Sequence, residues 1–407
     1  MAEPHHVVIV GTGLAGASAA GGLRERGYQG VITLIGQDAH RPYELPALSK
    51  AVLLGDASEP DWVHDEGYYE AQHIDLRTGT TATAVHLGDR AVLDDTGARH
   101  PYDRLLLATG SSPRALPVPG GDLAGLRTLR TLDDALALRD TFADGVRVVI
   151  VGGGWIGCEA AAAARKHGAS VTVVEPLPLP LHRTLGPTIA EVFRDLHAAN
   201  GVTWRLGVGV AGFEGTEDVV SGVALADGTT LEADVVLVGV GAAPRVDLAR
   251  AAGLELADTS GVAVDATLRT SAPDVYAAGD IAAHFHPRYG KRIRVEHWAN
   301  AKDQGALVAG NLLGESTPYT ASPYFFSDQY DLGMEVRGHW DPFEDDLVIR
   351  GDLTAREFTA FWTRAGRVQA AMNVNQWDDG EALQALVDNQ TAVSAEDLRS
   401  RDLASLR

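Results

Sequence analysis

The stretch Val148-Val149-Ile150-Val151-Gly152-Gly153-Gly154-Trp155-Ile156-Gly157 decides the fold of this 407-residue chain. Its apolar run predicts a buried β-strand, and the alanine-rich segment that continues to about His167 predicts a helix. Glycines at 152, 154 and 157 match the pattern G-x-G-x-x-G, which permits a tight turn, a close approach of the backbone to a pyrophosphate and a close helix-to-strand contact. The stretch therefore predicts a dinucleotide-binding loop with the phosphates at the helix N-terminus.

A second strand, residues 171–174, ends at Glu175, 18 positions after Gly157. A carboxylate at this position can accept hydrogen bonds from both ribose hydroxyls of an adenosine. It would repel the 2′-phosphate of NADPH, and the residues from Pro176 to Pro178 supply no compensating cation. We therefore expect NADH to be preferred over NADPH.

The N-terminus repeats the same unit. Residues 7–10 predict a strand, residues 11–16 a second glycine loop, and residues 31–35 the next strand. Gln37 or Asp38 then stands where a ribose-binding side chain is expected. Two loops indicate two bound nucleotides, although either loop alone could be a tight turn without a ligand.

The composition is typical of a soluble globular protein with two or three domains, at 45% hydrophobic and 22% charged residues. No apolar run is long enough to span a bilayer and the first residues do not resemble a signal peptide, so we expect a cytoplasmic protein. Lys plus Arg number 34 and Asp plus Glu 55, and the net charge of −21 argues against nucleic acid or membrane as the main partner. The single cysteine, Cys158, excludes an intrachain disulfide and a redox Cys pair beside a flavin, and we expect a buried thiol.

Other segments carry further candidate sites. Residues 82–108 predict a β-meander that closes with Ala108-Thr109-Gly110, and the proline-rich residues 113–121 predict a domain boundary. An apolar strand from Pro273 ends in Gly279-Asp280, where the carboxylate could bind cofactor hydroxyls or cap the next helix. The densest basic run, which is either a docking patch or a solvated loop, contains Arg288, Lys291, Arg292 and Arg294.

The C-terminal part differs in character. Residues 187–200 predict a helix, residues 203–204 a strand, residues up to 227–228 a hairpin and residues 235–241 a buried strand. From about Tyr319 aromatic residues become frequent. Alternation at 357–363 predicts antiparallel strands, and residues 380–389 predict a helix. We expect a compact α+β domain with most of its aromatic side chains in the core.

These motifs together resemble one family. The two glycine loops, residues 108–110, residues 278–280 and Ser327-Asp328-Gln329-Tyr330 occur in the order found in FAD-dependent NADH:ferredoxin reductases of bacterial oxygenase and cytochrome P450 systems. The resemblance covers essentially the whole chain and implies an α/β fold of the glutathione reductase type. It implies two Rossmann-like nucleotide-binding domains plus a C-terminal α+β domain: an FAD-binding domain at 1–112 and 242–320, an NAD-binding domain at 113–241 and a C-terminal reductase domain at 321–407.

The resemblance also implies the site residues. For FAD these are Gly11, Gly13, Leu14, Ala15, Gly16, Gln37, Asp38, Arg41, Lys50, Ala82, Thr109, Gly110, Arg130, Gly279, Asp280 and Trp298. For NAD they are Gly152, Gly154, Trp155, Ile156, Gly157, Glu175, Arg183 and Gly241. Lys50 and Glu159 are similar to a pair that lies near the flavin N5 in the family, so the resemblance makes them the catalytic candidates, whereas Lys50 by itself would be a surface lysine. The chain departs from the family pattern at Gln37, where an acid is usual, and at Phe326, where tryptophan is frequent.

The implied activity is transfer of hydride from NADH to FAD, followed by transfer of single electrons to a [2Fe-2S] ferredoxin docked on the basic run. A rubredoxin reductase and an NADH-sensing flavoprotein related to apoptosis-inducing factors stay open as alternatives. An NADH oxidase or peroxidase would usually carry a redox cysteine within residues 44–50, where this chain has none. The sequence leaves open which ferredoxin, which downstream oxygenase or P450, and which oligomeric state apply.

Overall fold

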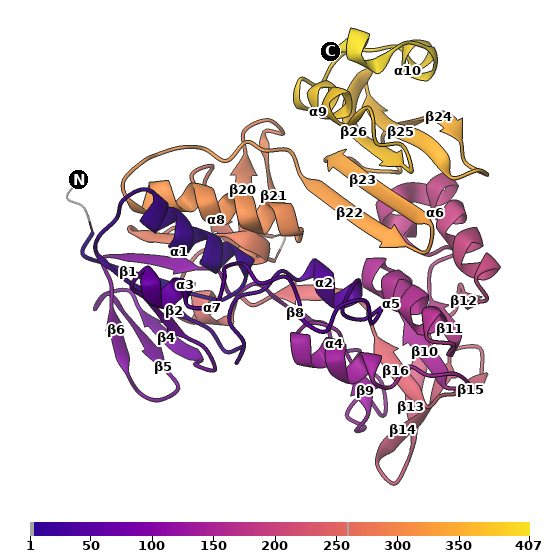
Figure 1. The fold of residues 1–407 in the computed structure, drawn as a ribbon, viewed down its shortest axis with the longest axis horizontal. Coiled ribbons are helices and arrows are strands. Elements are labelled where there is room, and N and C mark those ends of the chain that lie inside the picture. The colour runs from indigo at the N-terminus through magenta and orange to yellow at the C-terminus, as the bar shows by residue number, and fades with distance from the viewer. Residues whose placement is uncertain (1–3, 259) are drawn as a thin grey trace. The chain divides into compact units, whose positions relative to one another are not determined.

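The structure is a computed structural model that describes residues 4–258 and 260–407. Its residues form two compact units, whose elements are labelled in Figure 1. The first unit contains the chain up to Pro46 together with Pro60–Ser112 and Ala242–Ala321, and the second contains Ala47–Glu59, Pro113–Gly241 and Ser322–Arg407. Each unit is therefore assembled from three separate stretches of the chain.

A five-stranded parallel sheet forms the centre of the first unit, in the order β19-β7-β1-β2-β3. Its strands are β1 (His6–Val10), β2 (Val31–Ile35), β3 (Ile74–Arg77), β7 (Arg104–Leu107) and β19 (Val275–Ala277). All residues of β7 and β19 are buried, as expected for a parallel sheet covered on both faces. The strands predicted at 7–10 and 31–35 are confirmed.

Two helices of the first unit, α1 (Leu14–Glu25) and α8 (Trp298–Leu312), pack against each other (Figure 1). A Cβ added to Gly305 would stand 2.4 Å from the carbonyl oxygen of Ala15, and one on Gly22 would stand 3.1 Å from the Cβ of Ala309. The helices approach this closely only because these residues are small. As a result, α8 lies against the first turn of α1, directly after the N-terminal glycine loop.

Two three-stranded sheets also belong to the first unit. The predicted meander is confirmed for its first three strands, which pair antiparallel, whereas β7 pairs with β1 in the parallel sheet. The remaining elements are β4 (Ala82–His86), β5 (Ala91–Asp94), β6 (Arg99–Pro101), β17 (Ala242–Pro244), β18 (Val262–Val264), β20 (Ala282–His286), β21 (Lys291–Arg294), α3 (Tyr68–Ala71), α7 (Asp247–Ala251) and the 3₁₀ turn η1 (Gly279–Ile281). The short α2 (Pro46–Ser49) and β8 (Ser111–Pro113) lie where the chain passes from one unit to the other.

The second unit contains a parallel sheet in the order β12-β11-β10-β16-β9. The elements of this part are β9 (Leu126–Arg127), α4 (Leu132–Arg139), β10 (Arg147–Val151), α5 (Trp155–Lys166), β11 (Ser170–Glu175), α6 (His182–Ala199), β12 (Thr203–Leu206), β13 (Val210–Thr216), β14 (Val219–Leu225), β15 (Thr230–Glu232) and β16 (Val235–Val238). The predicted helix at 187–200 is the second part of α6, because Gly186, with a φ of 74°, interrupts the helix just before Pro187. A turn before Pro187 was not predicted.

The C-terminal part of the second unit is an antiparallel sheet in the order β22-β23-β26-β25-β24, with α9 packed on it (Figure 1). Its elements are β22 (Tyr324–Gln329), β23 (Leu332–Gly338), β24 (Asp346–Asp352), β25 (Glu357–Arg364), β26 (Arg367–Val374), α9 (Gly380–Asp388), α10 (Ala395–Ser400) and η2 (Leu403–Leu406). Phe358, Phe361 and Trp362 form its core, as predicted. Placing most aromatic residues in the core was wrong for Tyr330, Phe343 and Trp377, which are 36%, 59% and 55% exposed because they lie in turns and loops between the elements.

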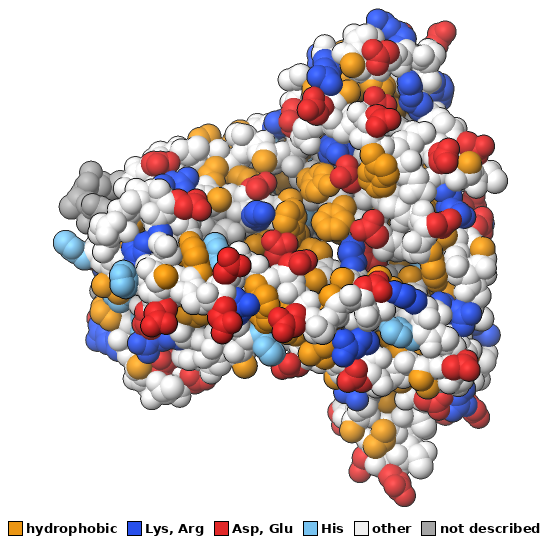
Figure 2. Space-filling model, in the orientation of Figure 1, with side chains coloured by type: hydrophobic (Ala, Val, Ile, Leu, Met, Phe, Trp, Pro, Cys, Tyr) orange, Lys and Arg blue, Asp and Glu red, His pale blue; other side chains and the backbone are white. Residues whose placement is uncertain are grey.

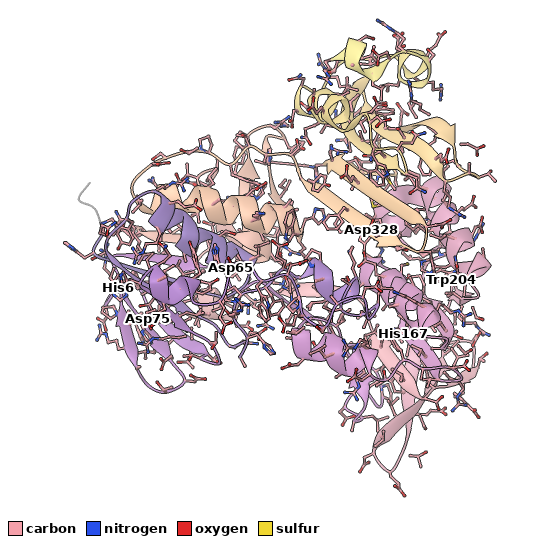
Figure 3. The ribbon with its side chains drawn as sticks, in the orientation of Figure 1. His6, Asp65, Asp75, His167, Trp204 and Asp328 are labelled. Carbon is pink, nitrogen blue, oxygen red and sulfur yellow. The ribbon has the colours of Figure 1, made fainter. Side chains whose placement is uncertain are left out.

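Residues 47–59 pack on the second unit, although the sequence resemblance assigns them to the FAD domain. Leu53 is buried in the core with Val148 and Ile150 of β10, and its carbonyl oxygen lies 3.1 Å from Nε2 of His167. Figure 3 labels His167 directly after the end of α5. The three predicted domain boundaries stay a prediction.

Candidate functional site

The glycine loop after β10 has the geometry that a bound pyrophosphate needs. Gly152 has a φ of 108°, and a Cβ on it would stand 2.4 Å from the carbonyl oxygen of Gly239. A Cβ on Gly157 would stand 2.0 Å from the carbonyl oxygen of Gly152, whereas one on Gly154 would meet no atom within 4 Å. The protein's own packing therefore explains the first and third glycines, and the second leaves open space at the start of α5.

The loop after β1 repeats this geometry in the first unit. Gly11 has a φ of 123°, and a Cβ there would stand 2.0 Å from the carbonyl oxygen of Ala108. A Cβ on Gly16 would stand 1.9 Å from the carbonyl oxygen of Gly11, and one on Gly13 would again meet nothing within 4 Å. The same division of roles among the glycines in two separate stretches points to the same kind of ligand.

Both helices begin in a way that suits an anion. Gly13 and Gly154 are the N-cap residues of α1 and α5, neither receives a side-chain cap, and neither first turn contains an acidic residue. The backbone N–H groups of such a turn and the positive end of the helix dipole favour a phosphate. The two loops thus fit the pyrophosphates of two dinucleotides, as the predicted pair of FAD and NAD requires.

Glu175 stands at the carboxyl end of β11, beside the glycine loop that follows β10. Its Oε2 accepts a hydrogen bond from the N–H of Gly153 at 2.7 Å, and its Oε1 accepts one from the N–H of Leu177 at 2.9 Å. These bonds fix the carboxylate against the glycine loop. Because each carboxylate oxygen has two lone pairs, the side chain can still accept the ribose hydroxyls predicted for it.

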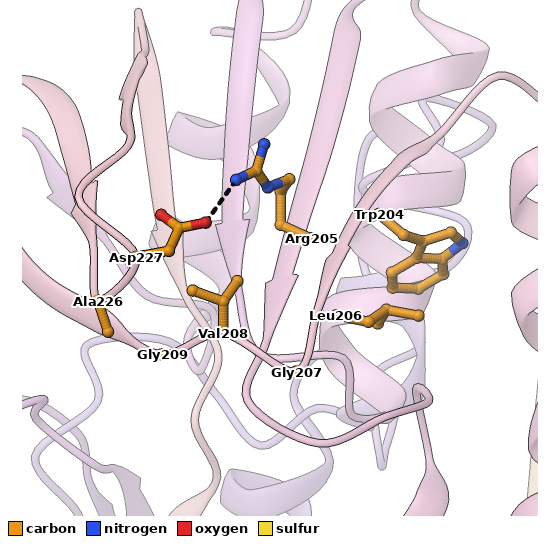
Figure 4. A pocket seen from close by; sticks show the side chains of 8 residues that line it. All are labelled: Trp204, Arg205, Leu206, Gly207, Val208, Gly209, Ala226 and Asp227. Carbon is orange, nitrogen blue, oxygen red and sulfur yellow. Dashed lines mark hydrogen bonds and ion pairs between the residues drawn. The ribbon is translucent and has the colours of Figure 1, made fainter.

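A shallow pocket of about 490 Å³ lies at the carboxyl end of the neighbouring strand β12 (Figure 4). Leu206, which lines it, pairs with Glu175 across the two strands. Arg205 forms an ion pair of 2.9 Å with Asp227 on its wall, while the indole N–H of Trp204 donates to the carbonyl oxygen of Arg194 in α6. None of the predicted site residues lines this pocket.

In the first unit the two candidates for ribose binding differ in their contacts. Asp38 accepts hydrogen bonds from the N–H of His40 at 2.9 Å and from the hydroxyl of Tyr43 at 2.7 Å. Gln37 is exposed at the carboxyl end of β2. Asp38 therefore holds its own loop, and Gln37 is left exposed.

The remaining FAD candidates of the first unit lie at the ends of β7 and β19. The hydroxyl of Thr109 donates to the carbonyl oxygen of Arg245 at 2.9 Å, and the carbonyl oxygen of Gly110 accepts from the N–H of the same residue. Gly279, with a φ of 77°, donates its N–H to the buried Oε1 of Gln304 at 2.9 Å. These contacts fix the backbone at Gly110 and Gly279, where two adjacent parallel strands end.

Other predicted residues are placed by their elements. Leu14 and Ala15 begin α1, Trp298 begins α8, Ala82 begins β4, and Arg41 lies 4.2 Å from the ring centroid of Trp62. In the second unit Trp155 and the 41% exposed Ile156 begin α5, Arg183 is exposed in the first turn of α6, Gly241 follows β16, and Arg130 precedes α4. The roles predicted for them stay predictions, and Arg130 belongs to the second unit, whereas the loop predicted to bind FAD belongs to the first.

The predicted catalytic pair is brought together within the second unit. The ammonium of Lys50 donates to Oε1 of Glu159 at 2.9 Å and lies 5.1 Å from the ring centroid of Phe326. Glu159, which is 3% exposed, also accepts from the hydroxyl of Ser49 at 2.5 Å and from the hydroxyl of Ser327 at 2.6 Å. Neither serine was among the predicted site residues, although Ser327 lies in the motif Ser327-Asp328-Gln329-Tyr330.

The basic run is only partly available to a partner. Arg292 donates to the carbonyl oxygens of Val264 and Ala283, and Arg294 donates to the carbonyl oxygen of Asp280 at 3.2 Å and forms an ion pair with Glu296 at 2.5 Å. Lys291 is exposed. On the face seen in Figure 2, acidic and basic side chains are interspersed.

Cys158 is fully buried, as predicted, and its thiol lies 3.7 Å from the carbonyl oxygen of Gly153. Burial raises the pKa of this thiol far above its usual range. Among the described residues, no group of three or more His, Cys, Asp or Glu side chains could hold a metal ion. No helix within residues 4–258 and 260–407 is long and apolar enough to cross a membrane.

Comparison with known proteins identifies the family. Residues 5–305 match the family described as pyridine nucleotide-disulphide oxidoreductase, and residues 324–406 match the one described as reductase C-terminal. Putidaredoxin reductase of Pseudomonas putida is 39% identical over 377 residues, which cover 91% of this chain and 89% of that protein. The ferredoxin–NAD(+) reductase component of the biphenyl dioxygenase system of Paraburkholderia xenovorans is 38% identical over 394 residues, 97% of this chain and 95% of that protein.

Among solved structures, the covalent complex of putidaredoxin reductase with putidaredoxin contains a similar chain. The TM-score is 0.94 at 36% identity, and the match covers 99% of this chain and 98% of that one. The predicted resemblance and the predicted α/β fold class with a C-terminal reductase domain are confirmed. The chain belongs to the pyridine nucleotide-disulphide oxidoreductase family.

Proposed function

We propose that the protein is an FAD-containing reductase that takes hydride from NADH and delivers single electrons to a [2Fe-2S] ferredoxin of an oxygenase or cytochrome P450 system. The observation that carries this proposal is the pair of matching pyrophosphate cradles, at Gly11–Gly16 and Gly152–Gly157, on one chain. The relatives named as ferredoxin reductases cover nine tenths or more of the chain and supply the acceptor class. With one cysteine the chain has no Cys pair to carry electrons, which fits transfer from the flavin to a separate protein.

Bound FAD would supply the redox chemistry, because a flavin accepts two electrons as hydride and can return them one at a time. The chain's own residues would bind and orient the two nucleotides. The first turn of α1 would hold the FAD pyrophosphate, and the first turn of α5 that of NADH. Glu175, fixed by the N–H groups of Gly153 and Leu177, would select the unphosphorylated ribose of NADH.

Lys50 and Glu159 would act at the flavin, as the family resemblance implies. An ammonium group held by a carboxylate is oriented before any reaction begins, and such a fixed cation stabilises negative charge that develops beside it. Glu159 is buried and makes hydrogen bonds to two serine hydroxyls as well as to Lys50. The Lys50 and Glu159 side chains would therefore need little rearrangement when negative charge develops on a bound flavin.

Docking of an acidic ferredoxin needs a local positive surface, since the chain carries a net charge of −21. Arg292 and Arg294 are engaged in contacts within the first unit, so Lys291 is the member of the basic run that is best exposed for this purpose. Replacement of Lys291 by glutamate should slow association with ferredoxin at low salt, and the difference should shrink at high salt. An unchanged rate would remove this run from the docking surface.

A cytoplasmic location is part of the proposal, because a reductase of this kind works among reduced cofactors.

The proposal is tested by anaerobic stopped-flow spectroscopy of the flavin-loaded protein. Mixing with NADH should bleach the flavin absorbance rapidly, and mixing with NADPH should bleach it slowly. The reduced protein should then be reoxidised rapidly by a [2Fe-2S] ferredoxin and slowly by rubredoxin and by oxygen. Rapid reoxidation by rubredoxin alone would make the protein a rubredoxin reductase. Slow reoxidation by every acceptor, with a lasting long-wavelength band, would make it an NADH sensor.

A further inference from the structure

A continuous series of buried polar side chains leads away from Glu159. The hydroxyl of Ser327 donates to Glu159 Oε1 at 2.6 Å, and Nε2 of Gln329 lies 3.0 Å from the Ser327 hydroxyl oxygen. Oε1 of Gln329 lies 2.8 Å from Nε2 of His197 in α6. These four side chains are between 0% and 3% exposed. Burying polar groups costs folding free energy unless each of them forms hydrogen bonds. The hydrogen bonds of this series therefore stabilise the interior of the second unit.

The hydrogen bonds of this series all run in one direction. Burial lowers the pKa of His197 to about 4, so its ring is neutral near pH 7. Its Nε2 must donate to the Gln329 oxygen, and its Nδ1 can accept from the hydroxyl of Tyr330, 3.4 Å away. The Gln329 amide then donates to Ser327, and Ser327 donates to Glu159. In each of these hydrogen bonds the donor therefore points along the series toward the Glu159 carboxylate.

Strand β22 explains how these side chains come to lie in the interior. Ser327 and Gln329 are buried and Asp328 between them is exposed, which is the alternation of a strand with one face on a core. Figure 3 labels Asp328 on this strand. The strand packs against α5, which carries Glu159, so β22 presents a hydroxyl to the carboxylate that holds Lys50.

We infer that Ser327, held by Gln329 and His197, is a positioning residue of the reductase reaction, which fixes the Glu159 carboxylate and through it the Lys50 ammonium. The inference rests on the proposed function. Ser327 and Lys50 share the same carboxylate oxygen, Oε1, so the direction in which that oxygen accepts from Lys50 depends on the Ser327 hydroxyl. The amide of Gln329 does not readily take up and release a proton, so the series transmits orientation rather than protons.

A double-mutant cycle distinguishes positioning from a merely structural role. The variants are Ser327→Ala, Glu159→Gln and the double variant, with Ser327→Thr as the conservative replacement that keeps the hydroxyl. Ser322→Ala is the matched control, because Ser322 is a buried serine whose hydroxyl also donates to a carboxylate, Oδ1 of Asp388 at 2.8 Å. Should Ser327→Ala lose its flavin, Gln329→Met takes its place, because it removes both amide hydrogen bonds and keeps the side-chain length.

Two quantities are measured in the flavin-loaded protein. The first is the rate constant of flavin reduction at saturating NADH, together with the dissociation constant of NADH. The second is the ¹³C signal of dimethylated Lys50 in the oxidised protein, which is resolvable because the chain has four lysines, Lys50, Lys166, Lys291 and Lys302. Lys166, paired with Asp56, serves as the internal control.

Ser327→Ala should slow reduction by about five-fold, which corresponds to one hydrogen bond of about 1 kcal/mol, with the NADH dissociation constant unchanged. It should shift the Lys50 signal and leave the Lys166 signal in place. Both effects should disappear in the Glu159→Gln background, and Ser327→Thr should restore the rate. Equal slowing in both backgrounds, or an unmoved Lys50 signal, would overturn the inference. Failure of the proposed function is a separate result, because it would appear in the unmodified protein as an absence of reduction by NADH or of transfer to ferredoxin.

Discussion

The two glycine loops allow one substitution to be placed at two positions with opposite expected results. Gly154→Ser puts a side chain where no atom of the protein lies within 4 Å, at an N-cap position whose φ of −80° suits any residue. Serine is a favoured N-cap residue, so the free energy of unfolding should stay within about 0.5 kcal/mol of the original value. The new side chain would occupy the space and the N–H groups that the NADH pyrophosphate needs.

Gly157→Ser makes the same chemical change three residues later in α5. Its Cβ would stand 2.0 Å from the carbonyl oxygen of Gly152, so the helix and the loop would have to part by more than about 1 Å to restore an ordinary carbon-to-oxygen contact of about 3.3 Å. Overpacking against backbone costs about 3 kcal/mol, and the better helix propensity of serine returns only about 0.5 kcal/mol. For a chain of 407 residues the unfolding midpoint should fall by about 3 °C.

Thermal unfolding and NADH titration of the two variants measure this contrast. Gly154→Ser should unfold at the original temperature and bind NADH about ten-fold to one-hundred-fold more weakly, because one or two charge-assisted hydrogen bonds to phosphate are lost. Flavin content should stay full in Gly154→Ser, since the loop proposed to hold FAD is the one at Gly11. The reasoning is refuted if Gly154→Ser binds NADH with unchanged affinity, or if both variants lose the same stability. Gly13→Ser and Gly16→Ser repeat the test for FAD, with flavin content as the measurement.

Three further predictions concern single side chains. Glu175→Gln removes the charge beside the ribose site, so the ratio of kcat/KM for NADH to kcat/KM for NADPH should fall by about ten-fold or more; an unchanged ratio would exclude Glu175 from coenzyme selection. Burial lowers the pKa of His197 from 6.5 to about 4, so the unfolded chain binds the extra proton and up to about 3 kcal/mol of stability is lost as the pH falls from 6.5 to 4. Urea unfolding across this range should show a shallower loss for His197→Gln, and identical slopes would contradict this reason. Cys158 should resist maleimide in the native protein and react in urea, and Cys158→Ala should reduce ferredoxin at the original rate; a loss of that activity would point to a redox role for the thiol.

The parts of the site that the sequence predicted are those set by local chemistry. A glycine loop has the same requirements wherever it occurs, because its third glycine meets the first glycine of the same loop: a Cβ on Gly157 would stand 2.0 Å from the carbonyl oxygen of Gly152. The position of Glu175 could be predicted because it is the last residue of the strand that follows the Gly152 loop and its helix. For the same reason the strands on both sides of each loop were predicted within one or two residues.

The parts that the sequence did not predict depend on contacts between distant residues. Glu159 meets Ser49 across 110 positions and Ser327 across 168, and His197 meets Gln329 across 132. Periodicity could place Ser327 and Gln329 on one face of a strand, but the partner of that face is chosen by how β22 packs on α5. The packing of residues 47–59 on the second unit is non-local in the same way.

The side chains of residues 44–50 explain how a fold of the disulphide oxidoreductase family can serve a reductase that has no redox disulphide. A redox cysteine in this segment, as expected for an NADH oxidase or peroxidase, would present a thiolate that could accept electrons from a flavin. In this chain Ser49 and Lys50 both donate hydrogen bonds to the buried Glu159, so the segment presents a hydroxyl and an ammonium fixed by one carboxylate. Neither group can be reduced. Electrons that reach a flavin here have no acceptor in the segment, and the remaining thiol, Cys158, is buried with a raised pKa. The segment thus lacks an internal electron acceptor and provides a fixed cation, which fits electron transfer from a bound flavin to a separate protein.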